Sequence, residues 1–151
     1  GRLPHDPPLN GDTVNKQINK QELIAEAAAA RLKAYTPYSN FKVGAALLTN
    51  DGKVFHGCNV ENAAYGLCNC AERTAFFSAF AHGYKPGDFD QLVVIGQTEG
   101  PIAPCGACRQ VILELGGDAL PVLLTNLKGD ILETTAAEQL PNGFGRADLK
   151  K

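Results

Sequence analysis

The 151-residue sequence lacks features that would each indicate a particular class of protein. No cluster of Lys or Arg occurs, and 14 basic residues against 16 acidic ones give a net charge of −2. Because phosphate neutralisation supplies much of the affinity of nucleic-acid-binding proteins, this charge pattern favours a small substrate over nucleic acid. No apolar run reaches the roughly 18 residues that a membrane helix needs, so we expect no membrane partner.

The five cysteines do not form the even set that is typical of small disulfide-bonded secreted domains. No secretory signal pattern accompanies them. We therefore expect a reducing, cytoplasmic location in which cysteines bind a metal. Residues 1–19 hold three of the nine prolines and few large apolar side chains. This composition predicts a flexible N-terminal tail, followed by a single domain over residues 20–151.

Hydrophobic periodicity and turn signals divide the rest of the chain into alternating helices and strands. Helices are predicted over 20–33, 70–80, 106–115 and 136–140, and strands over 41–48, 53–58, 92–95, 122–125 and 131–134. This order suggests a three-layer α/β/α sandwich with one mixed five-stranded sheet. The last two strands are joined by about six residues around Lys128-Gly129. A parallel crossover needs a dozen or more residues, so this pair is predicted to be antiparallel.

Two short motifs, Cys70-Ala-Glu72 and Pro104-Cys105-Gly-Ala-Cys108, carry the strongest chemical signal. Cys70 and Cys105 each fall where a loop gives way to a predicted helix, whose N-terminus favours thiolate over thiol. Cys108 follows one helical turn after Cys105, so the three sulfurs are expected to bind one zinc ion and leave its fourth position for water. Glu72, two residues from Cys70, is placed to move protons of that water. An open zinc site beside a carboxylate is typical of a hydrolytic enzyme.

Three thiolates around one dication leave a net negative charge, which favours positive residues nearby. Arg73 and Arg109 are the obvious candidates, since each lies next to a predicted ligand or close to one. We expect at least one of them, Arg73 in particular, to hydrogen-bond a ligand sulfur from outside the coordination sphere.

A structural zinc site is the alternative reading of these cysteines. Cys68 together with Cys70, Cys105 and Cys108 would supply the four thiolates of a closed site. Glu72 has no role in such a site, which favours the open one. The fifth cysteine, Cys58, is expected to be a small buried residue in a strand.

The histidines are weaker metal-binding candidates. His5 lies in the predicted tail, His56 in a strand and His82 near a helix end, and none is assigned to the metal.

The two motifs, with Arg73 after Glu72, resemble those of the zinc-dependent deaminases that act on cytosine-type bases. Cys70 in the first ligand position, where other members have His, resembles the small homotetrameric cytidine deaminases. Further similar segments are Tyr38-Ser-x-Phe-x-Val-Gly-Ala-Ala46, Gly57-Cys-Asn-Val-Glu-Asn62, Pro104-Cys-Gly-Ala-Cys-Arg-Gln-Val111, and Leu140-Pro141 with Phe144. The resemblance extends from Lys20 to Leu149.

This resemblance implies a cytidine deaminase-like fold and hydrolytic deamination of free cytidine and deoxycytidine, with uridine or deoxyuridine and ammonia as products. It further implies one zinc ion per subunit, Glu72 as the proton-transfer group, a role in pyrimidine salvage, and a homotetramer whose active sites are shared between subunits. Asn59 and Glu61 would hydrogen-bond the ribose hydroxyls, and Phe144 would lie over the base in a neighbouring subunit's site. The full set of implied substrate contacts is Phe41, Asn59, Glu61, Tyr65, Ala71 and Phe144.

Three other functions remain open from the sequence. A deaminase of bases in tRNA or single-stranded DNA is disfavoured by the charge pattern and by the short link between the last two strands. A non-catalytic zinc-stabilised binding module would require the closed four-cysteine site. A deaminase of a blasticidin-type aminonucleoside would use the same three cysteines and glutamate, and the Asn59 and Glu61 pair favours an ordinary nucleoside over such a drug.

Overall fold

One mixed five-stranded sheet forms the centre of the computed structural model, which describes residues 17–149. Its strands, in the spatial order β2-β1-β3-β4-β5, are β1 (Val43–Thr49), β2 (Val54–Cys58), β3 (Phe89–Gly96), β4 (Pro121–Asn126) and β5 (Ile131–Thr135). Strands β3 and β4 are parallel, whereas β1 pairs antiparallel with both β2 and β3, and β4 pairs antiparallel with β5. The predicted mixed sheet and its antiparallel last pair are confirmed.

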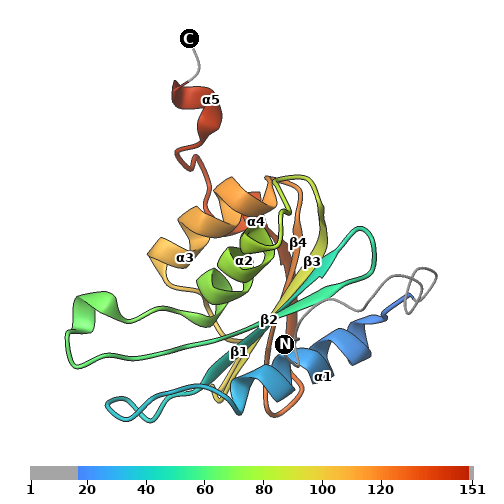
Figure 1. The fold of residues 1–151 in the computed structure, drawn as a ribbon. Helices are drawn as coiled ribbons and strands as arrows, with labels where there is room; N and C mark the ends of the chain where they lie inside the picture. The colour runs from blue at the N-terminus through green and yellow to red at the C-terminus, as the bar shows by residue number, and fades with distance from the viewer. Residues whose placement is uncertain (1–16, 150–151) are drawn as a thin grey trace.

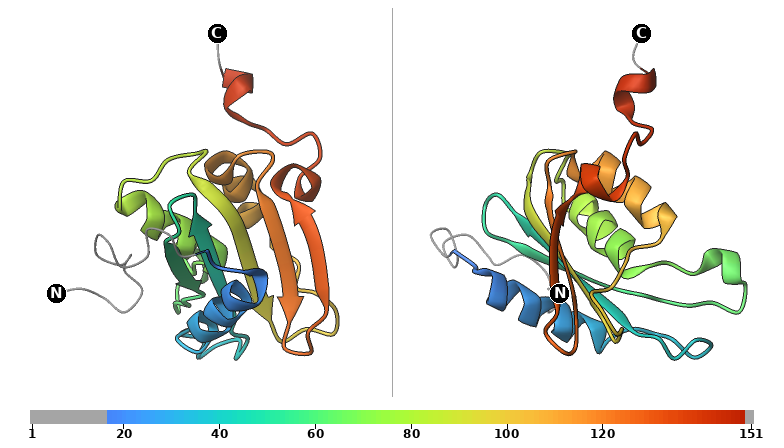
Figure 2. Two further views of the ribbon diagram at one scale, coloured as in Figure 1. Left: turned by 90° about the vertical axis from the view of Figure 1, so that its right-hand side faces the viewer. Right: turned by 180° about the vertical axis from the view of Figure 1, so that it is seen from behind.

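Helices cover both faces of the sheet and complete the predicted three layers. Helix α1 (Lys20–Arg31) lies on one face, and α2 (Ala71–Ala81) and α3 (Gly106–Val111) lie on the other (Figure 1). Helix α3 continues directly into a π-helical segment, η2 (Ile112–Gly116). The remaining helical turns are η1 (Tyr65–Leu67), α4 (Ala136–Gln139) and α5 (Arg146–Leu149), and α5 projects away from the body of the protein (Figure 2).

The alternation of strand side chains produces a hydrophobic core on each face of the sheet. Ala45 and Leu47 of β1 pack in the larger cluster beneath α2, α3 and η2, whereas Ala46 and Leu48 pack against α1. All seven residues of β1 are buried, as expected for a strand covered on both faces. Packing on both faces therefore fixes the central strands, and with them the positions at which the connecting loops begin.

Two glycines allow the helices to lie directly on the sheet backbone. A β-carbon on Gly57 of β2 would come within 2.0 Å of the Ala71 carbonyl oxygen in the first turn of α2. A β-carbon on Gly44 of β1 would meet the Ala27 carbonyl oxygen of α1 at 2.1 Å. Only glycine permits such approaches. The Gly57 contact fixes the start of α2, the residue after Cys70.

Several element bounds differ from those predicted. Helix α1 ends at Arg31 rather than at residue 33, β3 begins at Phe89 rather than at 92, and α5 was not predicted. Asn19 caps α1 by accepting a hydrogen bond from the Glu22 amide at 2.8 Å, and the partly buried Ile18 packs against the core cluster beneath α1. Residues 1–16 of the predicted tail lie outside the described residues, as does His5. Among the described residues, no helix is long and apolar enough to cross a membrane.

Candidate metal centre

The three predicted ligand cysteines converge at the N-termini of α2 and α3. Cys70 is the N-cap of α2 and Cys105 the N-cap of α3, while Cys108 lies in the first turn of α3. The three sulfurs all lie within 4.8 Å of one another, and those of Cys70 and Cys105 are 3.8 Å apart. Zinc–sulfur bonds of about 2.3 Å in tetrahedral geometry place sulfurs about 3.8 Å apart, so this cluster fits a zinc ion.

The cluster is open on one side. Cys108 is buried and Cys70 half-buried, whereas Cys105 is exposed. Solvent therefore reaches Cys105, the exposed member of the cluster. This exposure agrees with a site that leaves one coordination position to a non-protein ligand.

Cys68, the fourth cysteine of the closed alternative, points elsewhere. Its sulfur accepts a hydrogen bond from the Asn62 amide at 3.3 Å and donates one to the Asn62 carbonyl at 3.6 Å. Over residues 17–149, the group of side chains that can hold a metal consists of Cys70, Cys105 and Cys108, without Cys68.

The remaining cysteine and the described histidines lie in ordinary structural positions. Cys58 is half-buried in β2 rather than fully buried as expected, and desolvation raises the pKa of its thiol. His56 Nε2 lies 2.9 Å from a Glu26 carboxylate oxygen on α1, and His82 Nδ1 lies 2.8 Å from the Ser78 carbonyl.

Arg73 occupies the position that its expected role requires. Its Nη2 donates a hydrogen bond to the Cys70 sulfur at 3.3 Å. Hydrogen bonding from the Cys108 thiol, together with the Arg73 guanidinium, lowers the pKa of Cys70 to about 5 despite partial burial. The Cys70 thiolate in turn raises the pKa of Cys108. Cys70 is thus prepared to bind a cation as a thiolate before any ion arrives.

Arg109, the other cationic candidate, binds carbonyl groups instead of sulfur. Its Nε donates to the Pro104 carbonyl at 2.8 Å and its Nη1 to the Gln139 carbonyl at 3.0 Å. It therefore ties the residue before Cys105 to the end of α4, and supports the centre through the backbone.

Glu72 is a buried carboxyl group beside the sulfurs. It lies in the first turn of α2, two residues after Cys70, and only 4% of the residue is exposed. Burial raises the pKa of Glu72 to about 7, and the negative charge of Cys70 adds to this rise. A carboxyl group with a pKa near neutrality can take up a proton in one step and release it in another.

The two residues expected to bind ribose lie in a loop that is tied to the N-terminal side of β1. The Asn59 side chain accepts from the Val43 amide and donates to the Phe41 carbonyl, both at 2.8 Å. Glu61 accepts hydrogen bonds from the amides of Tyr38 and Ser39 at 3.0 and 3.1 Å, and from the Ser39 hydroxyl. The Ser39 hydroxyl, followed by these backbone bonds, lowers the pKa of Glu61. Sequence reasoning missed this supporting network, because it joins residues more than 15 positions apart.

The other expected substrate residues differ in exposure. Phe41, Tyr65 and Phe144 are exposed, and the Tyr65 ring meets the Tyr38 ring edge-on at a centroid distance of 6.0 Å. Ala71 is fully buried. The loops between α1 and β1 and between β2 and α2 extend beyond one end of the sheet, whereas the segment between α4 and α5 leads away from them (Figure 1). The substrate contacts of Phe41, Tyr65, Ala71 and Phe144 remain predictions.

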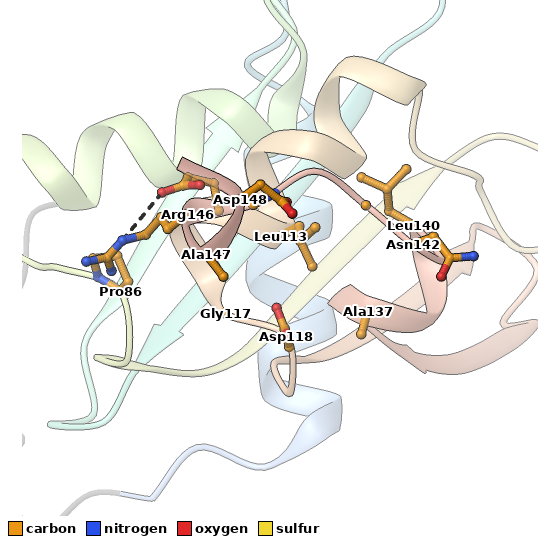
Figure 3. A pocket seen from close by; sticks show the side chains of 13 residues that line it. Pro86, Leu113, Gly117, Asp118, Ala137, Leu140, Asn142, Arg146, Ala147 and Asp148 are labelled. Carbon is orange, nitrogen blue, oxygen red and sulfur yellow. Dashed lines mark hydrogen bonds and ion pairs between the residues drawn. The ribbon is translucent and has the colours of Figure 1, made fainter. Parts of the chain in front are cut away.

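A cavity of about 520 Å³ lies beside η2, the segment that continues α3 beyond its cysteine-bearing first turn, and Figure 3 shows the residues that line it. It is lined by residues of η2, α4 and the C-terminal segment, among them Leu113, Leu140 and Arg146. No cysteine lines it, and neither does Glu72. This cavity is therefore distinct from the metal centre.

The fold and the three-sulfur centre with its buried carboxyl group define a zinc-binding hydrolytic α/β protein, and comparisons specify the class further. Residues 17–124 match the family described as "Cytidine and deoxycytidylate deaminase zinc-binding region". The chain belongs to this family. It is 58% identical over 132 residues to the cytidine deaminase of Sporosarcina psychrophila, covering 87% of this chain and 96% of that protein.

Two further comparisons show how the similarity is distributed within the family. The crystal structure of cytidine deaminase from Burkholderia pseudomallei matches with a TM-score of 0.83 and 67% identity, covering 84% of this chain and 100% of that one. The blasticidin-S deaminase of Bacillus cereus is 28% identical over 138 residues, covering 85% of this chain and 96% of that protein. The sequence identity is thus higher to these two cytidine deaminases than to the blasticidin-S deaminase.

Proposed function

We propose that this protein is a zinc-dependent enzyme that hydrolyses free cytidine and deoxycytidine to uridine and deoxyuridine with release of ammonia. The observation that carries the proposal is the convergence of three cysteine sulfurs at an open site beside the buried carboxyl group of Glu72. The identity of 58% with a cytidine deaminase over most of the chain supports the choice of substrate.

The zinc ion would be held by Cys70, Cys105 and Cys108. When bound, it would act as a Lewis acid that makes water a nucleophile at neutral pH. Glu72 acts as the proton carrier of the reaction. Its carboxylate accepts a proton from the attacking water, whose oxygen forms a bond to C4 of the pyrimidine. The carboxylic acid delivers this proton to N3. The regenerated carboxylate then takes the second proton from the hydroxyl group now on C4 and passes it to the amino group. The C4–N4 bond breaks as C4=O forms, and ammonia leaves. In the metal-free protein, burial raises the pKa of Glu72, which favours its uptake of a proton.

Asn59 and Glu61 are proposed to bind the ribose hydroxyls. Their side chains already bond the backbone of residues 38–43, yet a carboxamide and a carboxylate each retain unused donor or acceptor positions. Because the supporting bonds fix both side chains in place, substrate binding costs them little conformational entropy. Phe41 and Tyr65 are proposed to line the same site, and Ala71 to contact the base.

A homotetramer with shared active sites is the proposed assembly. Exposed aromatic and aliphatic side chains are numerous for a small chain, and Phe77 of α2 is exposed while its neighbour Phe76 is buried. The C-terminal segment leads away from its own substrate loops (Figure 1), which supports an action of Phe144 in a neighbouring subunit. We further propose a role in cytoplasmic pyrimidine salvage, which requires only free nucleoside as substrate.

The proposal is tested by measuring ammonia release and absorbance change with cytidine, deoxycytidine and blasticidin S, alongside the zinc content of each preparation. We expect the wild type to act on both nucleosides, and the Glu72→Ala variant to lose nearly all turnover while it retains zinc. Zinc-loaded wild type that leaves both nucleosides intact would contradict the assignment, and turnover of blasticidin S alone would replace it with the drug-directed activity.

A further inference from the structure

Three successive residues of α3 connect the metal centre to the C-terminal segment. Cys108 contributes a sulfur to the cluster, and Arg109 donates to the Gln139 carbonyl at 3.0 Å. Gln110, half-buried, donates from its side-chain amide to the backbone carbonyl of Phe144 at 2.7 Å. The helix that carries a metal ligand therefore also holds both ends of the segment 139–144.

The packing of this segment makes Gln110 important for the direction of Phe144. Asn142 adopts a left-handed conformation with φ of 56°, and the Gly143 amide closes a turn onto the Leu140 carbonyl at 3.1 Å. A β-carbon on Gly143 would lie 2.6 Å from a Leu113 methyl group, so the turn packs closely against η2. Figure 3 shows Leu113, Leu140 and Asn142 on these neighbouring elements. Beyond this turn, Phe144 is exposed and its ring is not held in the core.

We propose that Gln110 is a positioning residue, which fixes the direction in which the Phe144 ring leaves the protein and thereby sets the affinity for substrate. This inference rests on the proposed contact between Phe144 and the base. The hydrogen bond from Gln110 fixes the backbone of Phe144 immediately after the Asn142–Gly143 turn. Without this hydrogen bond, the ring is free to sample other directions. The cluster of sulfurs and Glu72 do not depend on this bond, so the chemical step is expected to persist.

The test compares steady-state kinetics on cytidine for Gln110→Ala and Gln110→Glu. The glutamate variant keeps the size of the side chain but, when ionised, cannot donate to a carbonyl. Loss of one hydrogen bond corresponds to a rise in KM of roughly three- to tenfold. We expect this rise in both variants, with kcat within about twofold of wild type and the zinc content unchanged. Gln139→Ala is the matched control, because its side chain bonds Thr134 at 3.3 Å and not Phe144, and its KM should equal that of wild type.

A double-mutant cycle with Phe144→Ala separates the possible failures. We expect Phe144→Ala to raise KM, and Gln110→Ala to add nothing in that background, because the residue would have no ring left to position. Two results would overturn the role of Gln110 and leave the proposed function standing, provided that Phe144→Ala raises KM. In the first, Gln110→Ala has the KM of wild type. In the second, the double variant has a KM raised by the product of the two single effects. A wild-type KM for Phe144→Ala would instead remove the proposed contact of Phe144 and this inference with it, without touching the deaminase activity.

Discussion

Replacing Glu72 with Gln should stabilise the metal-free protein at alkaline pH, because burial of a carboxylate destabilises the fold. Glu72 is almost completely buried, and its pKa is raised from 4.5 to about 7. That difference corresponds to roughly 3 kcal/mol between the two protonation states. Gln has nearly the same shape and carries no charge, so it avoids this cost.

The pH dependence follows from linkage. Below pH 4.5 the carboxyl group is protonated in both the folded and the unfolded protein, and the cost is absent. As pH rises from 4.5 towards 7, the unfolded chain releases the proton first, so the free energy of unfolding of the wild type falls. Above pH 7 the loss is complete. The advantage of Glu72→Gln is therefore expected to be about 1 kcal/mol at pH 5 and about 3 kcal/mol at pH 8.

Urea unfolding of both proteins, with chelator and reductant present, measures this difference. The protein concentrations must be equal, since association of subunits also contributes to stability. The reasoning would be refuted if Glu72→Gln were no more stable than wild type at pH 8. It would also be refuted if the difference in free energy of unfolding between the two proteins were the same at pH 5 as at pH 8. The expected result would mean that the burial which prepares Glu72 for proton transfer also lowers the stability of the fold.

Three further predictions concern the surroundings of the centre. Gly57→Ala would bring its β-carbon within 2.0 Å of the Ala71 carbonyl and displace α2, so urea unfolding should show a loss of about 1 to 3 kcal/mol or more. An unchanged free energy of unfolding would mean that α2 moves without cost to accommodate the methyl group. Cys68→Ala should keep the full zinc content by elemental analysis whereas Cys105→Ala should not, and equal zinc loss in both would favour the closed site. Arg73→Gln should weaken zinc binding or turnover by about 10- to 100-fold in chelator competition and kinetic assays, and unchanged values in both would exclude its contact with Cys70 as a functional one.

The parts of the structure that the sequence predicts are those that depend on local pattern. The short link around Lys128-Gly129 determines the antiparallel pairing of β4 and β5, and the spacing of Cys105 and Cys108 places both sulfurs on one helical turn. The N-terminal positions of Cys70 and Cys105 follow from where the helical pattern begins. Each of these inferences needs only a few neighbouring residues.

The parts that were not predicted depend on contacts between distant segments. Nothing near Asn59 indicates that its amide bonds the backbone of Phe41 and Val43, 16 to 18 positions earlier. Likewise, the bond from Gln110 to Phe144 spans 34 positions. Helix α5 is a single short turn after Asn142 and Gly143, and its four residues give too little periodicity to predict. Such contacts are set by how the layers pack, which a local pattern does not encode.

X-ray absorption at the zinc edge of the wild-type protein tests the central claim most directly, because it counts the sulfur atoms around the metal. The account predicts one zinc ion per chain with three sulfur neighbours at about 2.3 Å and one oxygen or nitrogen neighbour. A shell of four sulfur atoms would contradict it, since the metal would then have no position for water and Glu72 would have no water to deprotonate.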